Sequence, residues 1–136
     1  GKVKINQYKN LEFYGHLSLE NNGGVASVRA RDEGLAMKPG DTVVLRVRGD
    51  GRTYNFNVYT QRNMGGYSYR QSFATVDGEW IDVEFPVDKF VATWRGRNYR
   101  NQACDPASVA GLGILLGDKK PGVFKLEVES ISLKSK

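Results

Sequence analysis

Apolar and polar residues alternate with a period of two along most of this chain. Val43, Leu45 and Val47 fall on one side of an extended segment, whereas Arg46 and Arg48 fall on the other. The same alternation recurs in other segments, at residues 2–6, 11–19, 25–31, 54–59, 67–73, 80–85, 112–116 and 123–133. Successive side chains of a strand point to opposite faces, so this pattern predicts strands with one face in a core and the other in solvent.

Turn-forming residues separate these segments. The Asp50-Gly51 step is a strong hairpin signal because it stands between two alternating segments. Further turns are expected where Gly, Pro and Asn cluster, at residues 22–24, 39–41, 64–66, 77–78 and 121–122. No segment has a sustained helical period, and short helical turns are expected only at residues 86–90 and 105–110. About eight or nine short strands without intervening helices predict an all-β sandwich or barrel.

The size and composition of the chain are those of one soluble globular domain. A chain of 136 residues with 40% hydrophobic and 26% charged residues can bury a core without disulfides or metals. We therefore predict a single domain that spans residues 1–136. No apolar segment is long enough to span a membrane as a helix.

The charge of the chain is moderately basic, with 20 Lys and Arg against 15 Asp and Glu. A net charge of +5 favours weak attraction to acidic partners. The basic residues are spread out rather than clustered, so no nucleic-acid partner is expected. Cys104 is the only cysteine, which excludes an intrachain disulfide. This slightly favours a reducing compartment, and a disulfide-free secreted domain is the alternative.

The sequence lacks the residue combinations that common catalytic mechanisms need. His16 is the only histidine and stands mid-strand without a neighbouring acid, and no Gly-x-Ser-x-Gly motif is present. A Ser-His-Asp triad assembled only in the folded chain is left open by the sequence. We interpret His16 as a half-exposed sheet residue and Cys104 as an inert thiol in a loop, and predict that the protein is not an enzyme.

No cofactor or metal is predicted. Zinc sites need several Cys or His ligands, and the chain has one of each. A structural calcium ion is left open, because carboxylates stand in predicted turns at Asp32, Asp41, Asp50 and Asp118. The glycines of residues 111–117 lack the strand–helix context of a dinucleotide loop, so this segment is interpreted as a buried strand. Glu127 and Glu129 are interpreted as a solvated strand edge.

Several stretches of the chain resemble one known family. The most specific is Gly-His-Leu-Ser-Leu-Glu-Asn-Asn-Gly-Gly-Val-Ala-Ser-Val-Arg at residues 15–29. Together with further stretches at residues 49–54, 78–80, 85–86, 94–97 and 111–127, it is similar to the complex I intermediate-associated protein 30 family. The family usually carries an upstream strand segment with a Val-Met-Gly-Gly-like motif, which this sequence does not contain. We expect either that the segment has been removed or that this version lacks it.

The resemblance implies an antiparallel two-sheet jelly-roll sandwich of the galactose-binding-domain-like type. In eukaryotes it implies a non-enzymatic assembly factor for respiratory NADH:ubiquinone oxidoreductase, whose partner is an assembly intermediate. Many carbohydrate-binding modules share this architecture, so a glycan partner is the alternative. An intracellular location is favoured, which would be the mitochondrial matrix in a eukaryote and the cytoplasm or periplasm in a bacterium.

Outward-facing strand positions are rich in Arg, Asn and Tyr. The alternation places Tyr14, Ser27, Arg29, Arg46, Arg48, Asn55, Asn57 and Tyr59 on this side. Such a surface could stack on sugar rings or hold a protein partner, and an ordinary solvated sheet face is the alternative. We select four of these residues as binding candidates: Arg29, Arg46, Asn57 and Tyr59.

The two tryptophans stand in different contexts. Trp80 begins an alternating strand and is expected largely in the core. Trp94 and Arg95 stand in an Arg- and aromatic-rich segment, residues 93–100, which is predicted to be a contact loop. Such a mixture can also bind single-stranded nucleic acid, but no series of stacking residues on one strand supports this.

Overall fold

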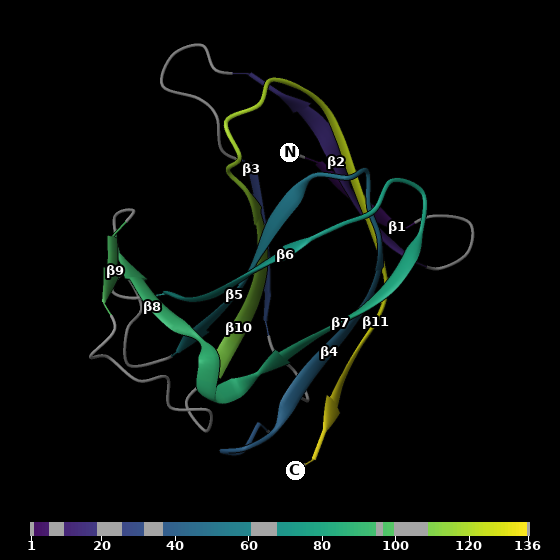
Figure 1. The fold of residues 1–136 in the computed structure, drawn as a ribbon. Helices are drawn as coiled ribbons and strands as arrows, with labels where there is room; N and C mark the ends of the chain where they lie inside the picture. The colour runs from purple at the N-terminus through teal and green to yellow at the C-terminus, as the bar shows by residue number, and fades with distance from the viewer. Residues whose placement is uncertain are drawn as a thin grey trace.

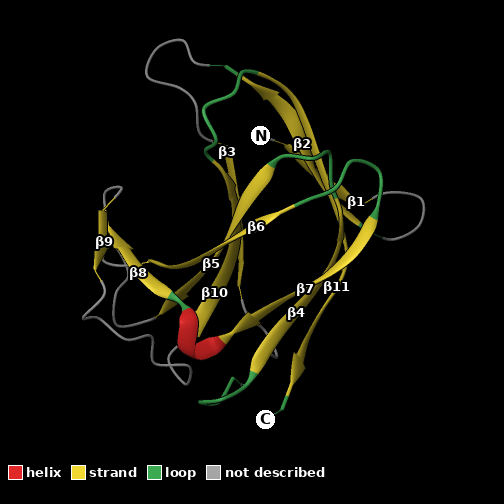
Figure 2. Cartoon of the chain, viewed as in Figure 1, coloured by secondary structure: helices red, strands yellow, loops and turns green. Residues whose placement is uncertain are grey.

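The computed structural model describes residues 2–5, 10–18, 26–31, 37–60, 68–94, 97–99 and 109–135, with only the backbone at residues 2, 26–31, 60, 94, 97–99 and 110. Within these ranges the chain forms two antiparallel sheets that face each other (Figure 1). A short 3₁₀ helix at Val87–Lys89 lies between two strands (Figure 2). The prediction of an all-β sandwich is confirmed, and so is the short helical turn within residues 86–90.

The first sheet, sheet A, has five strands in the order β1-β2-β11-β4-β7. Its longest strand, β11, lies at the centre and contains an irregularity between Val128 and Ser130. The strands are β1 (Lys2–Ile5), β2 (Leu11–Leu17), β11 (Gly122–Lys134), β4 (Thr42–Arg48) and β7 (Trp80–Pro86).

The second sheet, sheet B, has six strands in the order β3-β10-β5-β6-β8-β9. They are β3 (Ala26–Arg31), β10 (Val109–Leu116), β5 (Thr53–Thr60), β6 (Ser68–Ala74), β8 (Val91–Trp94) and β9 (Arg97–Tyr99). The described residues thus contain more strands than the eight or nine predicted, because β8 and β9 lie in the segment expected to be a loop. Val109 and Ala110, predicted to be helical, belong to β10, and residues 105–108 lie outside the described ranges.

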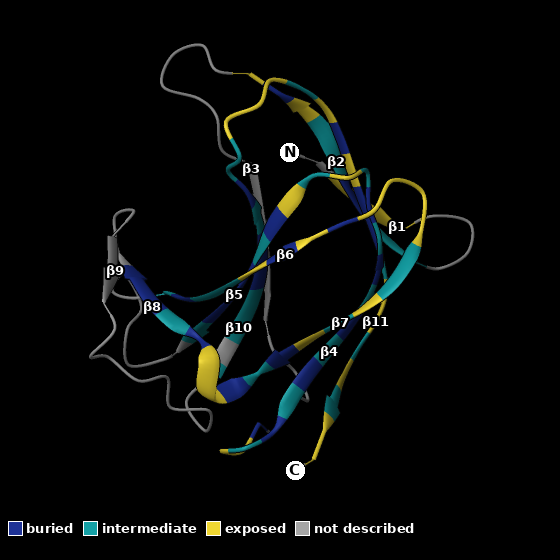
Figure 3. Ribbon diagram, in the orientation of Figure 1, coloured by how far each residue is buried: buried dark blue, intermediate teal, exposed yellow. Residues whose placement is uncertain are grey.

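The core lies between the two sheets, where the apolar face of each strand is buried (Figure 3). Val43, Leu45 and Val47 of β4 are buried, as their alternation predicts. Aromatic rings join the layers: Phe56 of β5 lies 4.8 Å from Phe85 of β7, measured between ring centroids. The prediction that residues 111–117 form a buried strand is confirmed in part: residues 111–116 belong to β10, between β3 and β5, where Gly113, Ile114 and Leu116 are buried and the others half-buried. No helix in the described part of the chain is long and apolar enough to cross a membrane.

The turn at residues 49–52 joins the two sheets instead of forming a hairpin. β4 belongs to sheet A and β5 to sheet B, so the hairpin prediction is wrong. The reason is that both strands bury an apolar face, and the two faces pack against each other across the core. Gly49 fits this turn because a Cβ there would lie 2.3 Å from the Cβ of Thr75. Gly51 adopts the left-handed conformation, with φ of 88°.

Arg52 fastens this turn to the segment between β10 and β11. Its guanidinium binds the Asp118 carboxylate through two hydrogen bonds, Nε to Oδ2 at 2.9 Å and Nη2 to Oδ1 at 3.0 Å. It also donates to backbone carbonyls, those of Lys120, Gly122 and Val123. The turn at residues 49–52 connects sheet A to sheet B, and the segment between β10 and β11 connects sheet B back to sheet A. The contact between Arg52 and Asp118 therefore holds these two connections together.

Candidate functional site

The structure separates the binding residues predicted from the sequence. Arg46 lies on the outer face of sheet A, because its neighbours Leu45 and Val47 are buried against sheet B. Asn57 and Tyr59 alternate with buried residues of β5 and therefore lie on the outer face of sheet B. These residues form no common surface, so the expectation of one flat polar face is wrong.

The outer face of sheet A carries oppositely charged side chains in contact. Arg46 donates to Glu129 at 3.0 Å and to Asp82 at 3.2 Å, and its hydrogen bond with Asp82 is the main reason why its pKa is raised. Arg48 donates to Glu127 at 2.7 Å. Further ion pairs continue across the face, namely Lys4–Glu12, Lys125–Glu12 and Lys134–Glu84. The charged side chains described on this face are thus paired with one another, and Arg46 already forms two ion pairs.

Two expectations for this face are wrong. Trp80 does not lie in the core: it is half-buried on the outer face, with its ring centroid 5.6 Å from Cζ of Arg46 and 5.1 Å from that of Arg48. Its side chain lies on the same face as that of Asp82, because the two residues are two positions apart in the same strand. Glu127 is not at a solvated edge: it lies on the central strand and is 1% exposed, with Asn10 and Arg48 as hydrogen-bond donors.

The outer face of sheet B contains a connected group of polar side chains. Asn57 stands opposite Gly113 of β10 on one side and Arg70 of β6 on the other. Arg70 Nε donates to Asn57 Oδ1 at 3.0 Å, and Asn57 Nδ2 donates to the Tyr59 hydroxyl at 3.2 Å. Asn57 is 1% exposed although it points away from the core. Gly111 stands opposite Tyr59 and Gly113 opposite Asn57. Because glycine has no side chain, β10 places no side chain beside these two residues on the outer face.

Arg70 was missed by the sequence analysis, although a signal was present. Tyr69 and Phe73 of β6 are buried, so the intervening Arg70 and Ser72 face outward by simple alternation. Ser72 donates to Asn55 Oδ1 of the neighbouring strand at 2.6 Å. The alternation in residues 67–73 predicts this strand, but the sequence alone does not show that it lies beside β5.

Three predicted contacts lie partly or wholly outside the described side chains. Arg29 stands in register with Gly113, which places its backbone in sheet B. Trp94 ends β8 and pairs with Arg97 of β9, so the predicted contact loop is instead largely a pair of strands. Arg95 and the lone Cys104 lie outside the described residues, and so does the Trp94 side chain. The binding roles of all three residues stay predictions.

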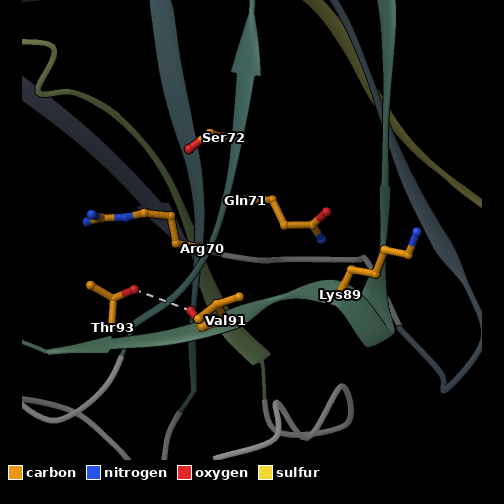
Figure 4. Close-up of a pocket in the computed structure, with 6 residues that line it drawn as sticks. All are labelled: Arg70, Gln71, Ser72, Lys89, Val91 and Thr93. Carbon is orange, nitrogen blue, oxygen red and sulfur yellow. Dashed lines mark hydrogen bonds between the residues drawn. The ribbon is translucent and has the colours of Figure 1, made fainter. Parts of the chain in front are cut away.

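A pocket of about 390 Å³ opens where β6 and β8 part. The two strands pair only as far as Arg70 and Val91, because the chain before β8 turns through the helix at Val87–Lys89. Gln71 donates to the Pro86 carbonyl at 2.8 Å across this gap. In Figure 4, Arg70 points to the opposite side of β6 from Gln71 and Lys89. The lining residues are Arg70, Gln71, Ser72, Lys89, Val91 and Thr93.

The described residues contain no cluster of three or more potential metal ligands. Asp50 accepts hydrogen bonds from the Tyr54 hydroxyl and from the Lys125 N–H, and Asp118 is bound by Arg52. Burial, reinforced by the Asp50 carboxylate, raises the pKa of Tyr54, which therefore stays a neutral donor. The positive charge beside Asp118 is therefore that of the Arg52 guanidinium. Asp32 of the predicted turn set lies outside the described ranges.

The sequence of the chain matches one family over most of its length. The model of the family described as Complex I intermediate-associated protein 30 matches residues 1–128. The chain belongs to this family. It is 34% identical over 101 residues to "Complex I intermediate-associated protein 30, mitochondrial" of Mus musculus, a match that covers 68% of this chain and 30% of the mouse protein. A Caenorhabditis briggsae relative is 34% identical over 99 residues, which cover 67% of this chain and 28% of that protein.

Several solved structures similar in fold to this chain are carbohydrate-binding modules or agarases. The family 11 carbohydrate-binding module of Clostridium thermocellum, solved with a beta-1,3-1,4-mixed-linked tetrasaccharide, has a TM-score of 0.74 at 13% identity and covers 98% of this chain and 81% of its own. A family 30 carbohydrate-binding module has a TM-score of 0.71 at 12% identity, with 98% and 83% coverage. An agarase has a TM-score of 0.67 at 13% identity, with 100% and 23% coverage. These likenesses confirm the jelly-roll architecture.

Proposed function

We propose that this chain is a non-catalytic interaction module that binds a protein partner in the assembly of respiratory complex I. The support is its membership of a family whose mouse relative is named as a complex I intermediate-associated protein. The matched part is less than a third of that mouse protein, so the chain is proposed to supply the binding domain. No catalytic group is assigned: His16, exposed on β2, has no role in the proposal.

The observation that carries the proposal is the difference between the two outer faces. Among the described residues, the charged side chains of sheet A are paired with one another. Sheet B presents Arg70 and Tyr59, which are linked through the buried Asn57, beside a stretch without side chains at Gly111 and Gly113. Arginine and tyrosine are enriched among residues that dominate protein interfaces. We place the partner on the outer face of sheet B. Arg29 and Trp94, whose backbones lie in the same sheet, remain predicted contacts. Arg95 also remains a predicted contact, and Arg46 remains one on the outer face of sheet A.

Affinity purification from the source organism tests this function. The chain, expressed with an affinity tag, is expected to enrich subunits of complex I, quantified by mass spectrometry. A matched Tyr59→Ala variant is expected to reduce that enrichment about tenfold, as loss of an interface anchor does. A His16→Ala variant serves as the folded control and is expected to enrich the same subunits as the original chain. No enrichment above a bare-tag control would rule out the proposal.

Carbohydrate binding is the second candidate function. It is favoured by the Tyr59 ring on the outer face of sheet B, since aromatic rings can stack on sugar rings. Titration calorimetry with a β-1,3-1,4-mixed-linked tetrasaccharide tests it. Saturable binding that disappears in Tyr59→Ala, together with no enrichment of complex I subunits, would assign the face to glycans instead.

A further inference from the structure

Arg70 differs from the other arginines whose side chains are described. Arg46, Arg48 and Arg52 each form an ion pair with at least one carboxylate. Arg70 forms none with any carboxylate in the described ranges, and its hydrogen bond goes to the neutral amide of Asn57. Unlike those three, its positive charge is therefore compensated by no carboxylate among the described residues.

The guanidinium of Arg70 is held in one orientation. Its Nε is bound to Asn57 Oδ1, and Asn57 is itself bound to Tyr59 and buried by its surroundings. This leaves the terminal nitrogens, Nη1 and Nη2, as a pair of donors with a fixed direction. Two parallel N–H donors of this kind match the two oxygens of a carboxylate. A preoriented donor pair loses little side-chain entropy when a ligand binds.

The surroundings of Arg70 disfavour its charge in the free protein. The side chain is half-buried, and this burial lowers its pKa. The pocket beside it contains a second cation, Lys89, and no acidic residue. Lys89 points to the other side of β6, so one positively charged side chain lies on each side of this strand (Figure 4). A bound anion would compensate the positive charge of Arg70 and so favour its charged form.

We propose that Arg70 binds the carboxylate of an acidic side chain of the protein partner, with Nη1 and Nη2 each donating to one carboxylate oxygen. This inference rests on the proposed function, because it places a protein on the outer face of sheet B. Charge complementarity identifies the partner segment as acidic. Ser72, which lines the same pocket next to Arg70, is positioned beside that segment.

Titration with peptides tests the inference without any unidentified ligand. Hexaglutamate is added to the ¹⁵N-labelled chain while the Arg70 Nε–Hε signal is followed by NMR, and hexaglutamine is the uncharged control. We expect saturable displacement of this signal by hexaglutamate and none by hexaglutamine. No displacement by hexaglutamate, or equal displacement by both peptides, would overturn the inference.

Variants separate a specific contact from general attraction. Arg70→Gln is expected to weaken hexaglutamate binding by about tenfold or more, and Arg70→Lys by less, because it keeps the charge but loses the paired donors. Lys134→Gln is the matched control, since it removes one positive charge from the outer face of sheet A. It is expected to change binding less than twofold. Equal losses in Arg70→Gln and Lys134→Gln would overturn the inference, and thermal unfolding checks that each variant folds.

The inference and the proposed function can fail separately. If hexaglutamate binds at Arg70 but the tagged chain enriches no complex I subunit, the acidic-ligand site stands and the proposed partner is wrong. If complex I subunits are enriched equally by the original chain and by Arg70→Gln, the function stands and the site is wrong. Binding of the neutral tetrasaccharide through Arg70, with no response to hexaglutamate, would overturn the inference in favour of a glycan.

Discussion

The outer faces of the two sheets use arginine in opposite ways. On sheet A, Arg46 and Arg48 are bound to carboxylates of neighbouring strands and cover the ring of Trp80. On sheet B, Arg70 is bound to an amide and has no carboxylate partner among the described residues. Both faces are polar, and each carries arginine at outward-facing positions of its strands. The partners of each arginine, and not its exposure, distinguish a face that stabilises the fold from one suited to binding.

The largest expected effect in this comparison comes from Arg52, the most enclosed of the paired arginines. Its side chain and that of Asp118 are each 12% exposed, so removal of one charge leaves the other poorly solvated. We expect Arg52→Ala to lower the free energy of unfolding by about 3 kcal/mol. Urea denaturation measures this change. A loss below about 1 kcal/mol would mean that the contact between the two crossings contributes little.

Acid should weaken the same contact. Burial alone would raise the pKa of Asp118, but hydrogen bonds from Arg52 and from the Lys120 N–H outweigh it and lower the pKa. A carboxyl whose pKa is lower in the folded state stabilises the fold above its unfolded pKa of about 4 and loses that contribution as pH falls through the folded value. The free energy of unfolding should therefore fall below pH about 4. Arg52→Gln should flatten this decline, and an identical decline in both proteins would contradict it.

Trp80 should contribute less than a core tryptophan. Because it lies under two guanidinium groups on an outer face, we expect Trp80→Ala to lower the free energy of unfolding by about 1 kcal/mol. Removal of a core tryptophan costs about 3–5 kcal/mol. Urea denaturation distinguishes the two cases. A loss of about 3–5 kcal/mol would mean that Trp80 stabilises the fold as a core residue does, and would contradict its placement on the outer face of sheet A.

The smallest effect on stability is expected at Arg70. Because it has no ion pair to lose, Arg70→Gln should leave the free energy of unfolding within about 0.5 kcal/mol of the original value. Asn57 would still find a hydrogen-bond partner in the new amide. Thermal and urea unfolding measure the difference. A loss of about 2 kcal/mol or more would make Arg70 a structural residue like Arg52 and abolish the contrast between the faces.

Within each strand, the sequence by itself determined which residues face the core. Val43, Leu45 and Val47 are buried and Arg46 is not, because successive side chains of a strand must point in opposite directions. The local signals for turns followed from the same steric rules, as at Gly51 with its positive φ. The family resemblance, spread over residues 15–127, anticipated the jelly roll and was confirmed by the match over residues 1–128.

Only the tertiary structure decided which outward-facing residues share a surface. β4 and β5 follow each other in sequence but pair with different strands, so Arg46 and Asn57 end on opposite sides of the molecule. Trp80 and Glu127 were misplaced for the same reason: the cross-strand neighbours, Arg48 for both, decide how far an outward side chain is covered. Alternation is a local constraint, whereas strand pairing depends on contacts between residues far apart in the chain. That is why the polar group around Arg70 could be located only after the strands were paired.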